Sequence, residues 1–158
     1  LSYKKNQVGA MGFIGAGLFK TGQLRLDYSR KRLMLSLPTD TVTARSICRG
    51  RKVPFVTNQY GFTTPVSTDV GELQFGWDTG SPAILLSQTA AAASRLEANL
   101  ESTEFTKFIV GGKDFGPQRI EIWSNIPLPK EISGLIGHPF FQDHKVCFDY
   151  PNRALHIQ

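Results

Sequence analysis

The sequence predicts an all-β fold with one short helix. Apolar residues recur in short alternating runs, and the 15 glycines and 9 prolines are spread along the whole chain. Alternation with a period of two is typical of half-buried strands. With 158 residues, of which 41% are hydrophobic and 20% charged, the chain suits one ordinary domain and is not a disordered segment.

The apolar runs predict three hairpins and one helix. The hairpins join 24–26 to 33–35, 62–68 to 73–77, and 108–110 to 120–123. The helix spans 90–100, which is rich in alanine and lacks glycine and proline, with Thr89 as its expected N-cap. Residues 38–54 are polar, basic and weakly periodic, so they are expected to form a linker.

The charge is uneven but indicates neither a nucleic acid nor a membrane partner. Residues 1–52 hold 11 Lys or Arg and 2 Asp or Glu, whereas residues 53–158 hold 7 and 11. The basic residues are scattered among apolar strand positions without the interleaved aromatic residues of a base-stacking surface. The longest apolar stretches are only a few residues, so no membrane span is predicted.

Cysteine and histidine usage predicts no metal site. Cys48 and Cys147 do not form a Cys-x-x-Cys pair and are too few for a disulfide scaffold. The three histidines lack zinc-like spacing. Cys147 is expected to be a packed or exposed thiol, and neither a metal nor an organic cofactor is expected.

An internal repeat is the strongest sign of organisation. Residues 12–35 align without a gap to residues 134–157, at an offset of 122. Seven positions are identical, among them Gly15 and Gly137, Asp27 and Asp149, and Tyr28 and Tyr150. One structural unit is therefore expected twice, and the aspartates before the tyrosines are expected to shape hairpin turns.

A short motif follows the apolar run at 73–77. It reads Asp78-Thr79-Gly80-Ser81, and 56 residues later comes Gly134-Leu135-Ile136-Gly137. An apolar pair closed by glycine lets one backbone pass close beside another. A run at 146–150 and a last strand complete the order, which resembles one lobe of the pepsin/retropepsin-like aspartic proteases.

This resemblance implies a role for each motif residue. Asp78 would be one of two catalytic carboxylates that share a proton and activate water to hydrolyse a peptide bond. Thr79 would lock two such loops together, Gly80 would allow close approach to the carboxylate, and Ser81 would hydrogen-bond its outer oxygen. Ile136 and Gly137 would support the loop.

The resemblance also divides the chain. Residues 1–41 would be the terminal strands of an upstream lobe plus linker, and 42–158 the lobe that carries the motif. At the same repeat spacing the second Asp would fall at position −44 (12 − 56), outside this chain, so this chain is expected to be the end of a two-lobe enzyme. A homodimer of single lobes is the alternative. In either case residues 1–36 are expected to pair with β-structure outside this chain.

Two departures from the family pattern keep a non-catalytic alternative open. Pro82 directly follows the motif and removes a backbone donor, and the stretch after it shows no substrate-covering flap hairpin. A protease-like module that binds a peptide or protein without cutting is therefore the second hypothesis. His138 is expected to be a supporting residue and Trp77 a core or groove-wall residue. The sequence does not fix a location, although a periplasmic or secreted one is favoured over the cytoplasm.

Overall fold

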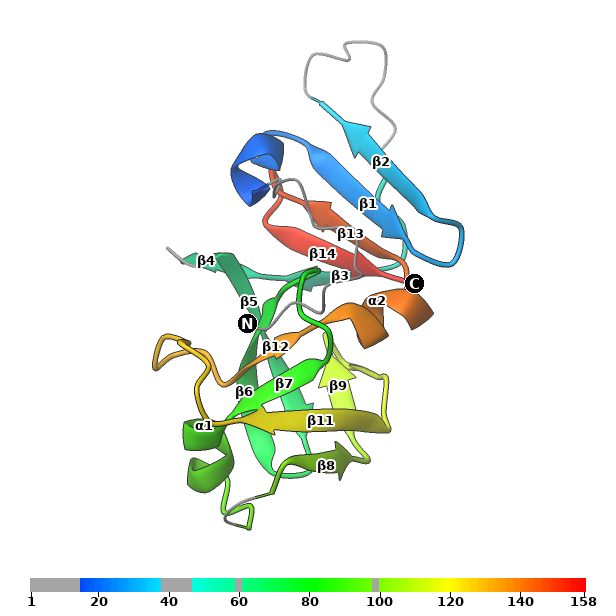
Figure 1. Ribbon diagram of the computed structural model, residues 1–158. Coiled ribbons are helices and arrows are strands. Elements are labelled where there is room, and N and C mark those ends of the chain that lie inside the picture. Colours follow the sequence, from blue (N-terminus) through cyan, green and yellow to red (C-terminus); the bar gives the residue numbers. More distant parts are fainter. Residues whose placement is uncertain (1–14, 38–46, 59–60, 98–99) are drawn as a thin grey trace, which may run out of the picture.

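The computed structural model describes residues 15–37, 47–58, 61–97 and 100–158 as two β-sheets that meet at a short helix (Figure 1). The first sheet has five strands, in the order β2 (Arg32–Ser36), β1 (Gln23–Asp27), β13 (Val146–Asp149), β14 (Ala154–Ile157) and β3 (Arg51–Pro54). The second has nine: β10 (Lys113–Asp114), β9 (Phe108–Val110), β5 (Gly61–Thr68), β6 (Gly71–Trp77), β12 (Gly134–Ile136), β7 (Ile84–Ser87), β11 (Gln118–Trp123) and β8 (Ser102–Phe105), with β4 (Val56–Asn58) beside β5.

Helices are few and short. They are η1 (Ala16–Phe19), a 3-10 turn, and the six-residue α1 (Gln88–Ala93) and α2 (His138–Asp143). Among the described residues, no helix is long and apolar enough to cross a membrane. The predicted mostly-β class is confirmed, with α2 as a helix that the sequence had not indicated.

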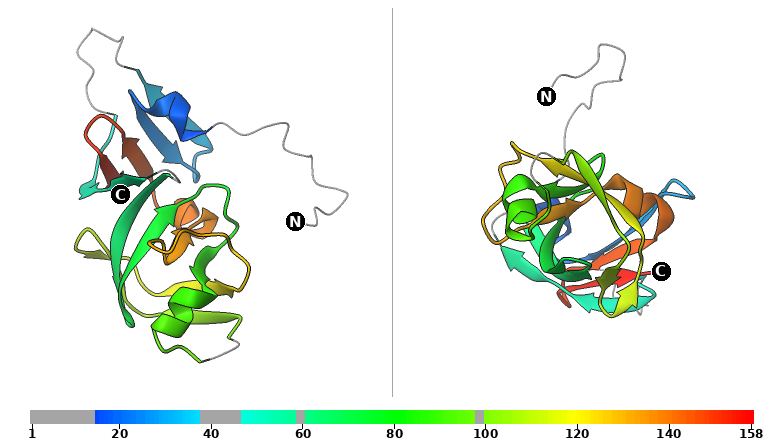
Figure 2. Two further views of the ribbon diagram at one scale, coloured as in Figure 1. Left: turned by 90° about the vertical axis from the view of Figure 1, so that its left-hand side faces the viewer. Right: turned by 90° about the horizontal axis from the view of Figure 1, so that it is seen from below.

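The nine-stranded sheet curls around its own apolar core, as the view along its axis shows (Figure 2). Phe75, Phe105, Phe108 and Ile120 are at most 1% exposed within it. Phe75 and Phe108 meet edge to face with ring centroids 5.6 Å apart. Burial of this apolar area is the main stabilising contribution to this half of the molecule.

Helix α2 joins the two sheets through consecutive phenylalanines. The Phe140 ring packs against Trp77 and Phe115 of the nine-stranded half, at 5.5 and 5.2 Å between centroids. The Phe141 ring lies between the two sheets, with its centroid 6.0 Å from that of Tyr28 and 5.9 Å from that of Trp77. Pro139 occupies the first turn of the helix, where a missing backbone N–H costs nothing. Two adjacent buried rings therefore fix how the sheets meet.

Two of the predicted hairpins are confirmed and the third is wrong. β1 pairs with β2, and β5 pairs with β6. However, β9 turns back at once to β10, whereas β11 pairs in parallel with β7 and antiparallel with β8. Gly111 and Gly112 both have positive φ, which allows a tight turn directly after β9. Phe115 to Pro117 then carry the chain away from β9, so 120–123 cannot return beside it.

The predicted helix and linker need correction as well. Helix α1 begins earlier than expected, because the Ser87 hydroxyl, not Thr89, accepts the capping hydrogen bond from the Ala90 N–H at 3.1 Å. It ends at Ala93, since Arg95 adopts a φ of +59°. Residues 38–46 of the expected linker lie outside the described residues, and 51–54 are not a linker but form β3, which pairs with β14.

The two copies of the internal repeat fold alike. At the offset of 122, η1 corresponds to the start of α2, β1 to β13 and β2 to β14. The turn bonds repeat too: Arg30 N–H donates to Asp27 as Asn152 N–H donates to Asp149, at 3.2 and 3.3 Å. Both aspartates thus shape hairpin turns, as expected. Hydrogen bonds to the Ser29 hydroxyl and Arg30 N–H, with nearby cationic charge, lower the pKa of Asp27 despite its burial.

A local two-fold relation passes between β1 and β13. Leu24 pairs with Phe148 and Leu26 with Val146, and each pair converts into the other when the repeat copies are exchanged. Arg25 and Cys147 are equivalent positions that face each other, so the axis passes through this pair. The expectation that residues 1–36 pair only with structure outside this chain is therefore wrong for β1.

A disulfide joins Cys48 to Cys147 across 99 residues. Cys147, which was expected to be a thiol, is therefore half of a disulfide. Cys48 belongs to the segment that crosses the outer face of the five-stranded sheet, where the Ile47 N–H also donates to Gln23 Oε1 at 3.0 Å. Closing a loop of this length stabilises a fold by roughly 4–5 kcal/mol in the chain-entropy model.

The burial of the Tyr150 phenol leads us to expect that the folded state loses stability at high pH. Burial raises the pKa of its phenol to about 12 from the ordinary value of 10.0, so the folded state favours the neutral form. Its contribution to the free energy of unfolding is complete below pH 10 and is lost as pH rises from about 10 to about 12. We expect Tyr150→Phe to flatten the pH dependence of urea midpoints over that window. An unchanged slope in the variant would contradict this assignment.

Candidate active site

The site is built where three strands of the nine-stranded sheet meet. β6 runs parallel to β12, with Trp77 beside Ile136, and β12 runs antiparallel to β7. The chain leaves β6 at Asp78, turns through 79–83 and returns as β7 on the other side of β12. The Asp78 N–H donates to the Ile136 carbonyl at 3.0 Å, which extends the parallel pairing by one residue and fixes the start of the loop.

Gly137 allows the loop to close on itself. The His138 N–H donates to the Ser81 carbonyl at 2.8 Å. A Cβ added at Gly137 would lie 2.1 Å from the Ala83 carbonyl oxygen and 2.6 Å from that of Ser81. The two backbones therefore touch where a side chain would stand, as the apolar-apolar-glycine pattern predicted.

The motif residues differ in burial and in role. Asp78, Thr79 and Gly80 are exposed, whereas Ser81 is only 4% exposed and Ile136 is fully buried. The Gly80 N–H donates to Asp78 Oδ1 at 2.8 Å and orients the carboxylate. The Ser81 hydroxyl, expected on this carboxylate, donates instead to the Ala83 carbonyl at 2.8 Å. Its role here is to hold the turn that leads into β7.

Asp78 stands between two hollows. One of about 400 Å³ lies toward the five-stranded sheet, with Leu24, Leu26, Phe148 and Tyr150 in its wall. The other, of about 380 Å³, lies beside residues 127–129. Trp77 borders both hollows, as expected for a groove-wall residue, and its indole N–H donates to the Thr64 hydroxyl at 3.0 Å. Asp78 is the one acidic residue among the described residues that line either hollow.

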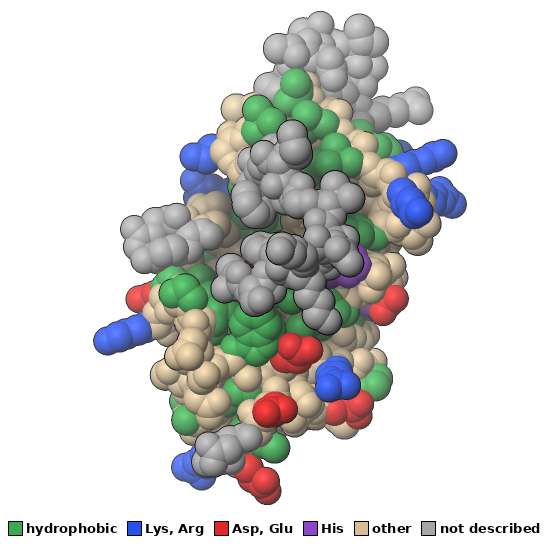
Figure 3. All heavy atoms as spheres, viewed as in Figure 1, with side chains coloured by type: hydrophobic (Ala, Val, Ile, Leu, Met, Phe, Trp, Pro, Cys, Tyr) green, Lys and Arg blue, Asp and Glu red, His purple; other side chains and the backbone are tan. Residues whose placement is uncertain are grey.

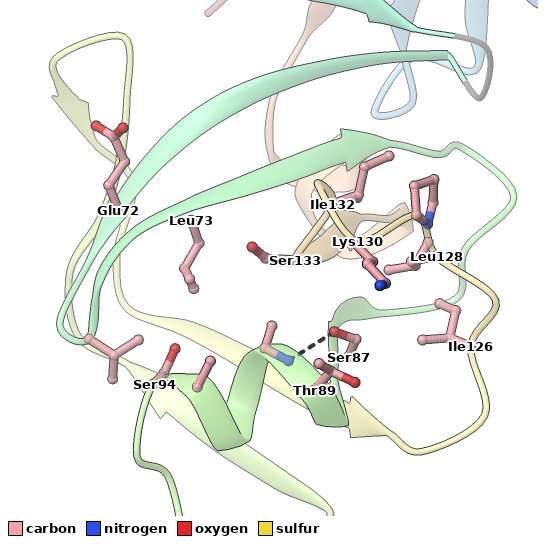
Figure 4. Close-up of a pocket in the computed structure, with 14 residues that line it drawn as sticks. Glu72, Leu73, Ser87, Thr89, Ser94, Ile126, Leu128, Lys130, Ile132 and Ser133 are labelled. Atoms are coloured by element: carbon pink, nitrogen blue, oxygen red, sulfur yellow. Dashed lines mark hydrogen bonds between the residues drawn. The ribbon is translucent and has the colours of Figure 1, made fainter.

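A third hollow, of about 430 Å³, lies beyond residues 128–132 and away from the motif (Figure 4). It is bounded by α1, by the start of β6 and by the 126–133 segment, and contains no residue of the 78–81 loop. Leu128, Pro129 and Ile132 are shared with the hollow beside Asp78. This segment therefore forms a wall between the two.

Among the described residues, the elements that neighbour Asp78 leave its side chain exposed. The β9–β10 hairpin, which follows the motif in sequence, is held against β3, where Arg51 donates to the Gly111 carbonyl at 2.9 Å. His138 contacts Tyr28 edge to face at 5.2 Å, consistent with a supporting residue. The lining residues Phe62 and Tyr28 were not identified from the sequence, because only the folded sheets bring them beside Asp78.

Comparison with known proteins gives structural matches only. No protein-family model and no curated protein matches the sequence. The structure resembles an aspartic proteinase from Irpex lacteus, with a TM-score of 0.52 and 14% identity over 85% of this chain. The chain has the fold of an aspartic protease lobe. It spans 55% of the length of that proteinase.

Two further solved structures share less of the fold. A retropepsin-like aspartic protease from Rickettsia conorii has a TM-score of 0.45 and 16% identity, over 56% of this chain and 76% of that one. The retroviral protease-like domain of Ddi1 from Leishmania major has a TM-score of 0.43 and 12% identity, over 61% and 90%.

The close approach at Gly137 makes a testable prediction for this protease lobe. Gly137→Ala places a methyl group against two carbonyl oxygens, so we expect a loss of about 1–3 kcal/mol in the free energy of unfolding. Gly17→Ala is the matched control, since a Cβ there has no atom within 4 Å, and it should change the unfolding free energy by less than about 0.5 kcal/mol. Equal denaturant midpoints for the two variants would refute the prediction.

Proposed function

We propose that this chain is the second lobe of an aspartic endopeptidase and that Asp78 is one of its two catalytic carboxylates. The observation that carries the proposal is the placement of Asp78. It is exposed at the end of β6, oriented by the Gly80 N–H and flanked by two hollows that meet at its side chain. The protease-lobe fold supports the same assignment.

The partner carboxylate is proposed to come from an upstream lobe. Strand β14 has β3 as its outer neighbour, but β2, the repeat equivalent of β14, is the edge of the sheet within the described part of the chain. Leu33, Met34 and Leu35 on β2 are 61, 41 and 40% exposed. Exposed apolar side chains gather at this end of the molecule (Figure 3). An unpaired apolar edge strand is a site for another strand, and the repeat indicates a counterpart of β3.

The proposed chemistry needs no metal or organic cofactor. Two carboxylates a few ångströms apart cannot both ionise easily, so they share one proton. The ionised one takes a proton from water, which attacks the peptide carbonyl, while the protonated one polarises that carbonyl. A peptide or protein substrate would bind in an extended conformation along the hollows beside Asp78, chiefly through backbone hydrogen bonds.

The Cys48–Cys147 disulfide is relevant to the compartment in which the protein works. Disulfides form and persist in oxidising compartments, and Cys48–Cys147 is formed in this structure. This supports the proposal of a periplasmic or secreted protein over a cytoplasmic one. We propose no nucleic acid partner.

Substitution of Asp78 tests the catalytic assignment. In the protein that includes its upstream lobe, Asp78→Asn should lower kcat for peptide hydrolysis by about 10²–10⁴-fold, because the shared proton and the general base are lost. Asp143→Asn, at an exposed position on α2, is the control and should retain activity. Undiminished cleavage by Asp78→Asn would disprove the assignment. An inactive but peptide-binding parent protein would instead favour the non-catalytic module.

A β2 substitution tests where the partner lobe docks. Leu33→Asp puts a charge on the exposed edge and next to the hollow that Asp78 borders, so it should weaken association with a separately produced upstream lobe by at least about tenfold. Val56→Asp, at a strand position that is 66% exposed outside that sheet, is the control. Self-association of this chain through β2, measured by sedimentation, would instead support the homodimer.

A further inference from the structure

A cluster of metal-ligating side chains lies on the outer, polar face of the five-stranded sheet, away from Asp78. The ligand atoms of Cys48, Asp149 and His156 all lie within 4.8 Å of one another. Cys147 belongs to the same cluster, since its sulfur is bonded to that of Cys48. We propose that reduction of this disulfide creates a zinc site in which Cys48, Cys147, Asp149 and His156 are the four ligands.

Strand register places the ligands on one face. Cys147 on β13 is directly opposite His156 on β14, and Asp149 follows two residues later on the same side of β13. The ligand atoms around a tetrahedral zinc are about 3.3–3.8 Å apart, given bonds of about 2.0–2.3 Å. The ligand atoms of Cys48, Asp149 and His156 would close in from a spacing of up to 4.8 Å, and the two sulfurs would move apart once their bond is broken.

His156 is the unexplained member of the cluster. Its Nε2 is buried, has no hydrogen-bond partner within the described residues, and lies 3.7 Å from Asp149 Oδ2. A buried polar atom without a partner costs free energy, and coordination would satisfy it. The side-chain amides of Gln23 and Asn152 donate to the Asp149 carboxylate at 3.0 and 2.9 Å. Such outer hydrogen bonds orient a ligand carboxylate for its metal.

The hairpin itself does not require Cys147 and His156. In the other copy of the repeat the equivalents of Cys147 and His156 are Arg25 and Met34, and the same hairpin forms without them. Only the aspartate recurs, because Asp27 and Asp149 both accept turn hydrogen bonds. Two thiolates, an imidazole and a carboxylate form a donor set that suits zinc.

The reaction balances with a dithiol as reductant. The dithiol gives two electrons and two protons to the Cys48–Cys147 bond, yielding two thiols and the oxidised dithiol. Zinc then displaces both thiol protons and binds two thiolates, the Asp149 carboxylate and the neutral His156 Nε2. The three negative charges exceed that of the ion by one, and Arg25 lies opposite Cys147 in the sheet. The metal would thus maintain the link between residue 48 and β13 that the disulfide makes.

Metal content tests the proposal independently of any protease activity. The chain is reduced with a phosphine under nitrogen, freed of reductant, incubated with Zn²⁺ or Co²⁺, and dialysed. We expect one metal ion per reduced chain by mass spectrometry and none per oxidised chain. The Co²⁺ form should show thiolate-to-cobalt charge-transfer absorption and the visible bands of a tetrahedral site. Reduced protein that retains no metal, or cobalt spectra without thiolate bands, would overturn the proposal.

Histidine variants separate the site from nonspecific binding. His156→Ala should weaken Zn²⁺ affinity at least about tenfold in a competition titration. His144→Ala is the control, because His144 packs against Phe115 and Phe140 instead, and its Zn²⁺ affinity should match the parent. Circular dichroism of each reduced, metal-free variant establishes that the chain is folded. Equal affinities in the two folded variants would also overturn the proposal.

Discussion

The close approach of β7, and of the turn before it, to β12 is the contact on which the rest of the structure depends, and glycines at and after β12 make room for it. At Gly134 an added Cβ would lie 2.0 Å from the Leu85 carbonyl oxygen, and at Gly137 it would lie 2.1 Å from that of Ala83. Strand β7 therefore packs directly on the backbone of β12. This contact determines where Asp78 emerges, how the 79–83 turn closes, and where α2 begins. The positions of the two α2 phenylalanines, and hence the meeting of the two sheets, follow from it.

The five-stranded sheet is assembled in a different way from the nine-stranded one. It is assembled from two equivalent hairpins, β1–β2 and β13–β14, related by the axis through Arg25 and Cys147. The β13–β14 hairpin is extended by β3, whereas in the β1–β2 hairpin the described residues place no strand beyond β2. In the proposed two-lobe enzyme this sheet would be shared between the lobes, and the proposed partner carboxylate would face Asp78 across the same axis.

The sequence allowed one local backbone contact to be predicted better than the topology. The close approach at Gly137 could be predicted because it restricts residue type, and glycine has no substitute there. The Cys48–Cys147 pairing and the β7–β11 pairing could not, since both join residues far apart in sequence whose proximity depends on the folded sheets. Ser81 was assigned to the wrong acceptor because a hydroxyl within a turn has several carbonyls in reach.

Helix α2 shows a second limit of local patterns. Its six residues include Pro139 and two phenylalanines, which are weak helix formers in isolation. The helix is stabilised by burial of both rings, since Phe140 packs against the nine-stranded half and Phe141 contacts both Trp77 and Phe148, and that environment is tertiary. By contrast, the turns at Asp27 and Asp149 were predictable from the local sequence. In each, the aspartate carboxylate accepts a hydrogen bond from the backbone N–H three residues later, and this needs no distant part of the chain.

The pairing of β1 with β13 also affects how the chain is made. These strands occupy equivalent places in the two repeat copies, 122 residues apart. At a synthesis rate of about 5–20 residues per second, β13 is therefore made roughly 6–24 s after β1. During that interval the β1–β2 hairpin has no partner on its β1 side. Pairing over such a sequence distance also slows folding. The nascent chain therefore passes through a state in which an apolar strand is available to chaperones or to neighbouring chains.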